Sequence, residues 1–190
     1  MRWGSLFGDM EAQLAEAARR EREGGESDVT RSERAGSTLL DRLRGSEGGM
    51  VAVTLDAGLS PAGTLRKVGN GWLILDAGTH DWLIPTDGIL CLEGLSRRSA
   101  PEAASVWQGR GLGAALRMIS RDRSPVRVFL GYGGTCPAER LGVIAGVGAD
   151  HLELSVLDAT GERPRGTVAI PFRGVLALRG EGVVGAFEGM

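Results

Sequence analysis

The chain has 190 residues, a hydrophobic content of 42% and a formal net charge of −2 at pH 7. These values are typical of a globular protein, and they exclude wholesale disorder and a collagen-like fibre. No apolar run reaches the ~20 residues of a membrane span, and the N-terminus carries no signal-peptide core. We therefore expect a cytoplasmic protein without a membrane partner. Glycine is the outlier, with 31 residues in the chain, roughly twice its usual frequency.

Residues 1–48 hold ten acids and eight bases without strand-like alternation, and they are expected to form an N-terminal helical segment. Apolar residues recur at alternating spacings of four and three along an amphipathic helix that ends near Glu23: Trp3, Phe7, Met10, Leu14 and Ala17. A second helix is expected from Ser27 or Asp28 to about Gly45. The first helix packs on the chain's own β structure, or it forms a dimer coil or docks on a partner.

A strand-like pattern begins after this segment and occurs twice. Hydrophobic residues alternate with polar or small ones over residues 51–56 and again over 126–130. Thirteen positions match at offsets of 79 or 86 residues, and they include Gly63 with Gly142, Gly69 with Gly148, Leu75 with Leu154, Ile84 with Ile170 and Gly94 with Gly180. We interpret this pattern as the internal duplication of a five-stranded unit.

Each repeat has the size of a small bent barrel, and the excess glycine fits strands that kink where such a barrel closes. The expected fold class is mainly β with helices: two tandem small five-stranded barrels, an N-terminal helical pair and a linker helix. The expected domains are the helical segment (1–48), a first barrel (49–97), an Arg-rich linker with a helix (98–124), a second barrel (125–182) and a tail (183–190).

The repeats resemble the Sm-like fold, an SH3-like barrel of five strands behind a leading helix. The segments GTLRKVGNGWLIL and GVIAGVGADHLEL match the strand–turn–strand frame of the first family motif, with Gly69 and Gly148 where the family usually has Asp. LALRG, with Arg179 and Gly180, matches the second motif. The resemblance implies two Sm-like barrels whose grooves serve as binding sites. The layout also resembles a group of actinobacterial proteins with an MRW-type helical start, which implies no activity.

A basic stretch lies between the repeats. Residues 97–123 contain two acids and six arginines: Arg97, Arg98, Arg110, Arg117, Arg121 and Arg123. Leu112, Leu116 and Ile119 predict a helix that begins after Gly111 and ends before Pro125. Arginines contact phosphate and stack on bases. We therefore expect a binding or adaptor protein that contacts RNA, DNA or a nucleic-acid-associated protein through these arginines, Arg179 and the barrel grooves. Ion pairing with the acidic leader is the alternative.

Two tryptophans flank one hairpin of the first repeat, and Trp72 and Trp82 are candidate partner contacts. Because His151 takes the place of Trp72 in the second repeat, we expect Trp72 to be exposed. The alternative function is a protein–protein interaction scaffold or homodimer that uses Trp3, Phe7, Met10 and Leu14 of the first helix.

An enzyme is the least favoured function, because the sequence holds no converging set of nucleophile, acid and base. Two cysteines and two histidines do not make a zinc-ligand set. The glycine-rich segment GRGLGAALR lacks the residues of a Walker loop or a dinucleotide fingerprint. We expect no catalytic residue, no metal and no other cofactor.

Overall fold

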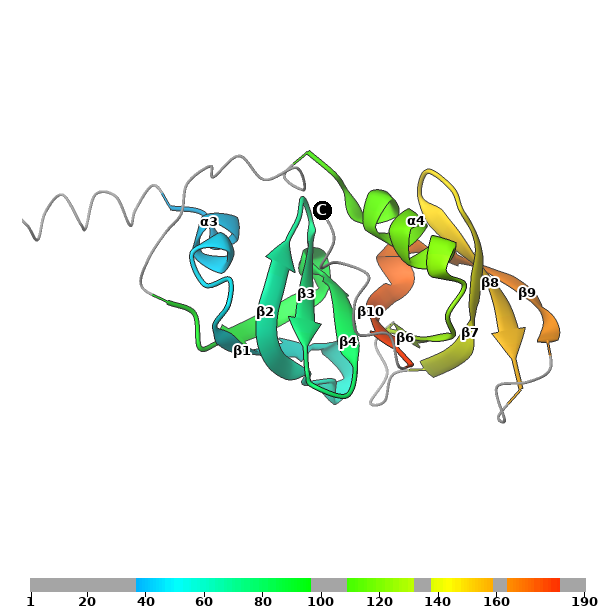
Figure 1. Ribbon diagram of the computed structural model, residues 1–190, viewed down its shortest axis with the longest axis horizontal. Coiled ribbons are helices and arrows are strands. Elements are labelled where there is room, and N and C mark those ends of the chain that lie inside the picture. The colour runs from blue at the N-terminus through cyan, green and yellow to red at the C-terminus, as the bar shows by residue number, and fades with distance from the viewer. Residues whose placement is uncertain (1–36, 97–108, 132–137, 159–163, 182–190) are drawn as a thin grey trace, which may run out of the picture. The chain divides into compact units, whose positions relative to one another are not determined.

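The computed structural model describes residues 37–96, 109–131, 138–158 and 164–181. Its elements in chain order are α3 (Leu39–Arg44), β1 (Met50–Leu55), the 3-10 turn η1 (Asp56–Gly58), β2 (Ala62–Val68), β3 (Trp72–Asp76), β4 (Asp81–Pro85), η2 (Thr86–Gly88), β5 (Ile89–Glu93), α4 (Leu112–Asp122), β6 (Val126–Leu130), β7 (Ala138–Val147), β8 (His151–Leu157), β9 (Pro164–Pro171), η3 (Phe172–Gly174) and β10 (Val175–Gly180) (Figure 1). No helix among these residues is long and apolar enough to cross a lipid bilayer.

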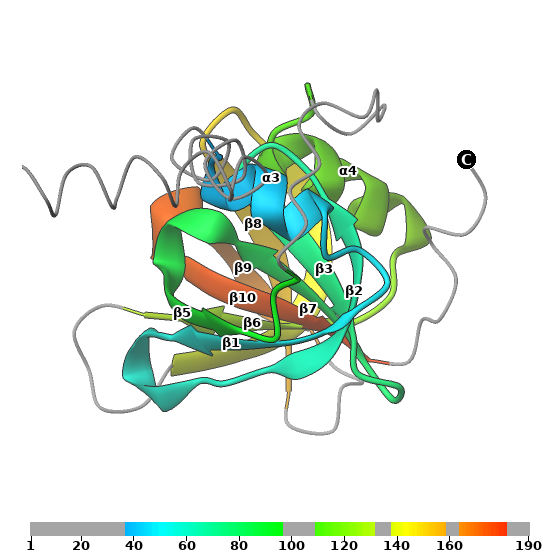
Figure 2. The ribbon, with the colours of Figure 1, turned by 90° about the vertical axis from the view of Figure 1, so that its left-hand side faces the viewer.

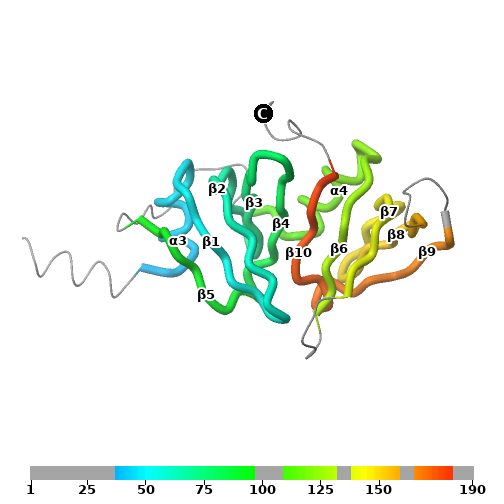
Figure 3. Tube along the Cα trace, turned by 90° about the horizontal axis from the view of Figure 1, so that it is seen from below, coloured from blue at the N-terminus to red at the C-terminus, as the bar shows by residue number. Residues whose placement is uncertain are grey.

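The strands form one open ten-stranded antiparallel sheet in the order β5-β1-β2-β3-β4-β10-β6-β7-β8-β9. Figure 3 shows β10 between β4 and β6, so that the last strand of the second half joins the fourth strand of the first. This pairing, here called the seam, places Leu83 opposite Leu178 and Trp82 opposite Arg179. The prediction of a mainly β chain with helices is confirmed. The prediction of two separate barrels is corrected, because backbone hydrogen bonds at the seam join both halves in one sheet.

The two halves share one strand order, in which the last strand lies beside the first and the second, third and fourth follow. A β-bulge between Leu65 and Lys67 in the β2–β3 pair recurs between Ile144 and Gly146 in the β7–β8 pair. Both bulge positions are related by the 79-residue offset of the sequence repeat. The internal repeat is therefore also a repeat of backbone geometry.

Glycine is required at one equivalent position of each half, where two strands approach closely. A Cβ atom at Gly63 would collide with the backbone carbonyl of Asp76, and a Cβ at Gly142 would collide with that of Ser155. These two glycines allow β2 and β7 to cross their neighbours at short range. Part of the excess of glycine thus has a steric cause.

Two hydrophobic cores lie on opposite faces of the seam, and each contains residues from both halves. Trp72, Ile74 and Leu83 of the first half share one core with α4 and with β6–β10. The other core consists of first-half residues together with Phe129, Leu176 and Ala177. Along β10, Val175 and Leu178 belong to the first core, whereas the consecutive Leu176 and Ala177 both belong to the second, because a register shift between Val175 and Ala177 interrupts the alternation of the strand. Neither half has a core of its own.

Of the second predicted N-terminal helix, the structure describes α3, which begins only at Leu39 because Ser37 and Thr38 before it are not helical. Its Leu43 is buried in the core that the first half shares with Phe129, Leu176 and Ala177. After the helix, the buried Ser46 hydroxyl donates to the carbonyl of Arg42 at 2.7 Å and accepts the backbone N–H of Ser96 at 2.9 Å. These bonds connect the beginning and the end of the first repeat. The first predicted helix, with Trp3, Phe7, Met10 and Leu14, lies outside the described residues.

Candidate nucleic-acid interface

Helix α4 forms because its apolar residues recur on one face. Leu112, Ala115, Leu116 and Ile119 follow the i, i+3, i+4, i+7 pattern of an amphipathic helix. Ala115 and Leu116 are completely buried, and they pack in the core that β3 and β4 share with the second half. The linker helix that the sequence predicts is confirmed.

The C-terminal end of α4 has an unusual residue at its cap. Arg123 ends the helix in the left-handed conformation, with φ at 52°, where glycine is the common choice. Its backbone N–H donates to the carbonyl of Ser120 at 3.3 Å. Pro125 follows, which cannot continue a helix. The chain therefore turns sharply at an arginine.

Four of the predicted arginines lie together on the solvent side of α4 and at its ends. We call Arg110, Arg117, Arg121 and Arg123 the α4 arginine surface, and all four residues are exposed. Arg117 and Arg121 are one helical turn apart, on the face opposite the buried Ala115 and Leu116. Arg117 and Arg121 are therefore neighbours on the helix, whereas Arg110 and Arg123 lie at its two ends. Arg97 and Arg98 lie outside the described residues.

The beginning of this surface is fixed to the first half. The indole Nε1–H of Trp72 donates to the backbone carbonyl of Arg110 at 2.9 Å, and the backbone N–H of Asn70 donates to the same oxygen at 3.4 Å. Trp72 itself is completely buried in the core beneath α4. The expectation that Trp72 is an exposed partner contact is therefore wrong: its ring packs over Gly69 and positions the linker.

The middle of α4 is attached to the second half. The guanidinium of Arg117 donates to the backbone carbonyl of Gly148, in the β7–β8 turn, at 3.2 Å. Gly148 is the repeat equivalent of Gly69, which lies in the β2–β3 turn. Helix α4 thus lies between the two equivalent turns of the sheet (Figures 1 and 2). The α4 arginine surface is consequently held by both halves.

Few acidic groups oppose the charge of this surface in the described part of the chain. No ion pair there includes Arg117, Arg121 or Arg123. The carboxylate of Asp150, two residues beyond Gly148, lies 2.9 Å from the ring nitrogen Nδ1 of His151. This hydrogen bond holds the pKa of Asp150 below its ordinary value. Asp122, between Arg121 and Arg123, accepts a hydrogen bond from the Ser124 hydroxyl at 2.7 Å. The surface is therefore cationic on balance, with four arginines against this one carboxylate.

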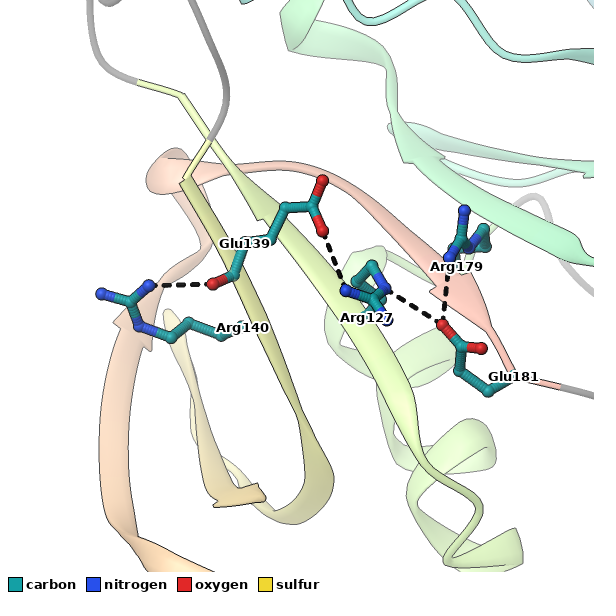
Figure 4. Close-up of polar contacts among 5 residues, drawn as sticks. All are labelled: Arg127, Glu139, Arg140, Arg179 and Glu181. Atoms are coloured by element: carbon teal, nitrogen blue, oxygen red, sulfur yellow. Dashed lines mark hydrogen bonds and ion pairs between the residues drawn. The ribbon is translucent and has the colours of Figure 1, made fainter. Parts of the chain in front are cut away.

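A second group of charges lies beside the seam, in the second half. Glu181 accepts hydrogen bonds from Arg127 and Arg179, each at 3.1 Å, and Arg127 also pairs with Glu139 at 2.9 Å (Figure 4). Burial alone raises the pKa of Glu181. The hydrogen bonds and positive charges of the two arginines outweigh it, so that the pKa lies below its ordinary value. This network links β6, β7 and the end of β10.

Arg179 is separated from the α4 arginine surface. Its neighbour Leu178 points into the core under α4, so the side chain of Arg179 lies on the other face of the sheet. There its guanidinium lies 5.7 Å from the ring centroid of Trp82 and 5.8 Å from that of Phe129. The two rings stack at 5.1 Å. Trp82 and Arg179 thus pack against each other at the seam, and the charge of Arg179 is paired with that of Glu181.

The seam network leaves no signal in the sequence. Arg127 and Glu181 are 54 residues apart, and no motif connects them. The pairing of Arg127 with Glu181 depends on the register between β6 and β10. This register is set only when β10 inserts between β4 and β6. The three strands that carry the network all belong to the second half.

The described residues hold no assembled metal-binding site. No group of three His, Cys, Asp or Glu side chains there is arranged to hold a metal ion. His80 bonds through Nδ1 to the backbone carbonyl of Gly180 at 3.1 Å, which gives it a local partner. No protein-family model matches the chain, and no curated protein is significantly similar to it in sequence. The function is accordingly inferred from α4 and the sheet alone.

Proposed function

We propose that this is a non-enzymatic nucleic-acid-binding protein that contacts the phosphate backbone through the α4 arginine surface. One observation carries the proposal: the exposed Arg117 and Arg121 lie side by side on a helix that both halves of the sheet hold in place. A guanidinium offers a rigid fork of donors that matches phosphate oxygens. Preorganised arginines lose less freedom on binding than arginines on a loop.

The proposed mode is contact with phosphate rather than reading of bases. Stacking on single-stranded bases needs accessible aromatic rings beside the charges. Trp72, whose indole bonds to the Arg110 carbonyl, is completely buried, and Phe172, whose ring lies beside Gly113 of α4, is partly buried against the same core. Phosphate contacts position a nucleic acid without specifying its sequence. We therefore expect the affinity for nucleic acid to depend steeply on salt concentration and little on base sequence.

We also infer that each half descends from an Sm-like unit. A leading helix, five strands and the return of the last strand beside the first support this inference. The common strand order and the equivalent bulges add to it. On this view the two units are fused along the seam, and α4 is the leading helix of the second.

The test is a fluorescence-anisotropy titration of the full chain with a short labelled single strand and the matching duplex. Affinity is expected to fall steeply with salt, with a slope of about 0.7–0.9 logarithmic units for each phosphate contact. The double variant Arg117→Gln/Arg121→Gln should bind about tenfold or more weakly at low salt. It should reduce the salt slope by roughly 1 to 2.

Arg140→Gln is the matched control, because Arg140 is an exposed arginine on β7 (Figure 4). It removes one positive charge without changing α4. Equal weakening by Arg140→Gln and by Arg117→Gln alone would assign binding to net charge and contradict the proposal. Absence of binding by the native chain at low salt would also contradict it.

A further inference from the structure

A small cavity lies at the seam, against the C-terminal turn of α4. Its volume is about 50 Å³, and Ile74, Leu83, Ile119, Val126 and Leu178 give it a mostly apolar wall. These residues come from both halves of the chain. The cavity is far smaller than the ~300–1,000 Å³ of sites for drug-sized ligands. Its size therefore suits a single side chain rather than a cofactor.

The charged side chains of the lining are acidic, and Ser124 adds a hydroxyl. Asp81 and Asp122 both line the cavity, and no basic side chain does so. Asp122 accepts a hydrogen bond from the Ser124 hydroxyl at 2.7 Å. Asp81 takes part in none of the ion pairs that the structure describes. The cavity thus combines an apolar wall with two carboxylates.

Asp81 is held in an unfavourable electrostatic environment. Burial raises its pKa, the carboxylate of Asp76 raises it further, and Arg66 opposes this rise. Arg66 is itself hydrogen-bonded to Asp76, with Nε at 3.0 Å from the carboxylate. A partly buried carboxylate in this position is stabilised by any cation that reaches the cavity.

We propose that this cavity receives one arginine or lysine side chain of a partner protein. Such a side chain has an aliphatic stem for the apolar wall and a cationic head for Asp81 and Asp122. The choice of occupant follows from charge complementarity. This site is distinct from the α4 arginine surface, because it selects a positive charge and not a negative one.

The probe for the test is butylguanidinium, which carries the stem and head of an arginine side chain. Butylurea is its neutral isostere. Each is titrated into the full chain while the backbone amide signals of Ile119 and Gly180 are followed by NMR. Butylguanidinium is expected to shift these signals saturably. The affinity of butylurea should be lower by about tenfold or more, because butylurea lacks the charge-assisted hydrogen bonds.

Variants connect the effect to the two carboxylates. Asp81→Asn and Asp122→Asn should each weaken binding of butylguanidinium, and together they should abolish it. Asp87→Asn is the matched control, because Asp87 is an exposed carboxylate on η2 outside the cavity. Should Asp81→Asn fail to fold, Asp122→Lys keeps the test decisive. This exposed position tolerates lysine, whose own ammonium should block the site.

Three results would overturn the proposal. Equal binding of butylguanidinium and butylurea would make the cavity a purely apolar site. Unchanged affinity in the double asparagine variant would place the probe elsewhere.

The third result concerns the C-terminal segment, because the chain continues past Glu181 with Val183, Val184 and Phe187. If Phe187→Ser alone shifts the cavity signals while the native chain ignores the probe, the occupant is the chain's own C-terminal segment.

Discussion

The indole nitrogen of Trp72 lies 2.9 Å from the backbone carbonyl oxygen of Arg110, and this contact joins strand β3 to the segment that begins α4. The two residues are 38 positions apart in the chain. Through this bond a completely buried ring in the first half fixes the start of a helix that caps the second half. The contact explains how the cationic segment obtains a defined position on the sheet.

Trp72→Phe tests this connection. The smaller ring loses the hydrogen bond and leaves a void, so we expect the free energy of unfolding to fall by about 2–4 kcal/mol. Urea unfolding followed by circular dichroism measures the change. Trp82→Phe is the comparison, because Trp82 is only partly buried and stacks on Phe129 without an indole hydrogen bond among the described residues. An equal loss of unfolding free energy in both variants would show that the hydrogen bond to the Arg110 carbonyl adds no stability of its own.

Arg123→Gly should change stability and binding in opposite directions. Glycine adopts the left-handed conformation without the cost of about 1 kcal/mol that a side chain pays there. The free energy of unfolding is therefore expected to rise by roughly that amount, while affinity for nucleic acid falls. Arg121→Gly, inside α4, should lower both quantities, since glycine destabilises a helix interior by ~1 kcal/mol. A less stable Arg123→Gly variant would refute the first expectation.

Glu181 makes the seam sensitive to acid. The pKa of its folded state lies below the ordinary value of 4.5 because of Arg179 and Arg127. A carboxylate with a depressed pKa stabilises the fold above its unfolded pKa, and this stabilisation is lost as pH falls through the folded pKa. We expect Glu181→Gln to be less stable than the native chain at pH 7. Urea midpoints measured between pH 7 and about pH 3 should converge as pH falls.

Asp81 should show the opposite dependence on pH. Burial raises the pKa of its folded state above the ordinary 3.8, so the folded form binds its proton more tightly than the unfolded form. Stability therefore falls as pH rises from the unfolded pKa through the folded pKa. Asp81→Asn removes this loss, and the variant should exceed the native chain in stability at pH 7. The difference in unfolding free energy between the variant and the native chain should disappear at acidic pH. A difference that grows at acidic pH would contradict the raised pKa of Asp81.

Gly63→Ala and Gly142→Ala should each destabilise the fold, because the new methyl group meets a backbone carbonyl that cannot move alone. We expect losses above ~2 kcal/mol in unfolding free energy, as for other overpacked sites. Gly174→Ala is the control, since a Cβ at Gly174 meets nothing within 4 Å. Similar midpoints for all three variants in thermal unfolding would show that the strands relax around the added atom.

The sequence determined the local elements and the repeat. Alternation over residues 51–56 and 126–130 predicts strands, and the spacing of Leu112, Leu116 and Ile119 predicts α4, since both patterns reflect the periodicity of a half-buried element. The offset of 79 residues correctly relates equivalent glycines and bulges. The exposure of Arg117 and Arg121 also follows from the helical period.

Only the tertiary structure decided how the halves combine. Pairing of β4 with β10 is a choice among exposed strand edges, whose backbone groups carry no sequence signal. That choice buries Trp72 under α4, stacks Trp82 on Phe129 and removes Arg179 from the cationic surface. It also creates the cavity, because Asp81 of the first half and Asp122 of α4 line one space only when both halves share one sheet. Long-range register, unlike periodicity, is a property of the folded chain.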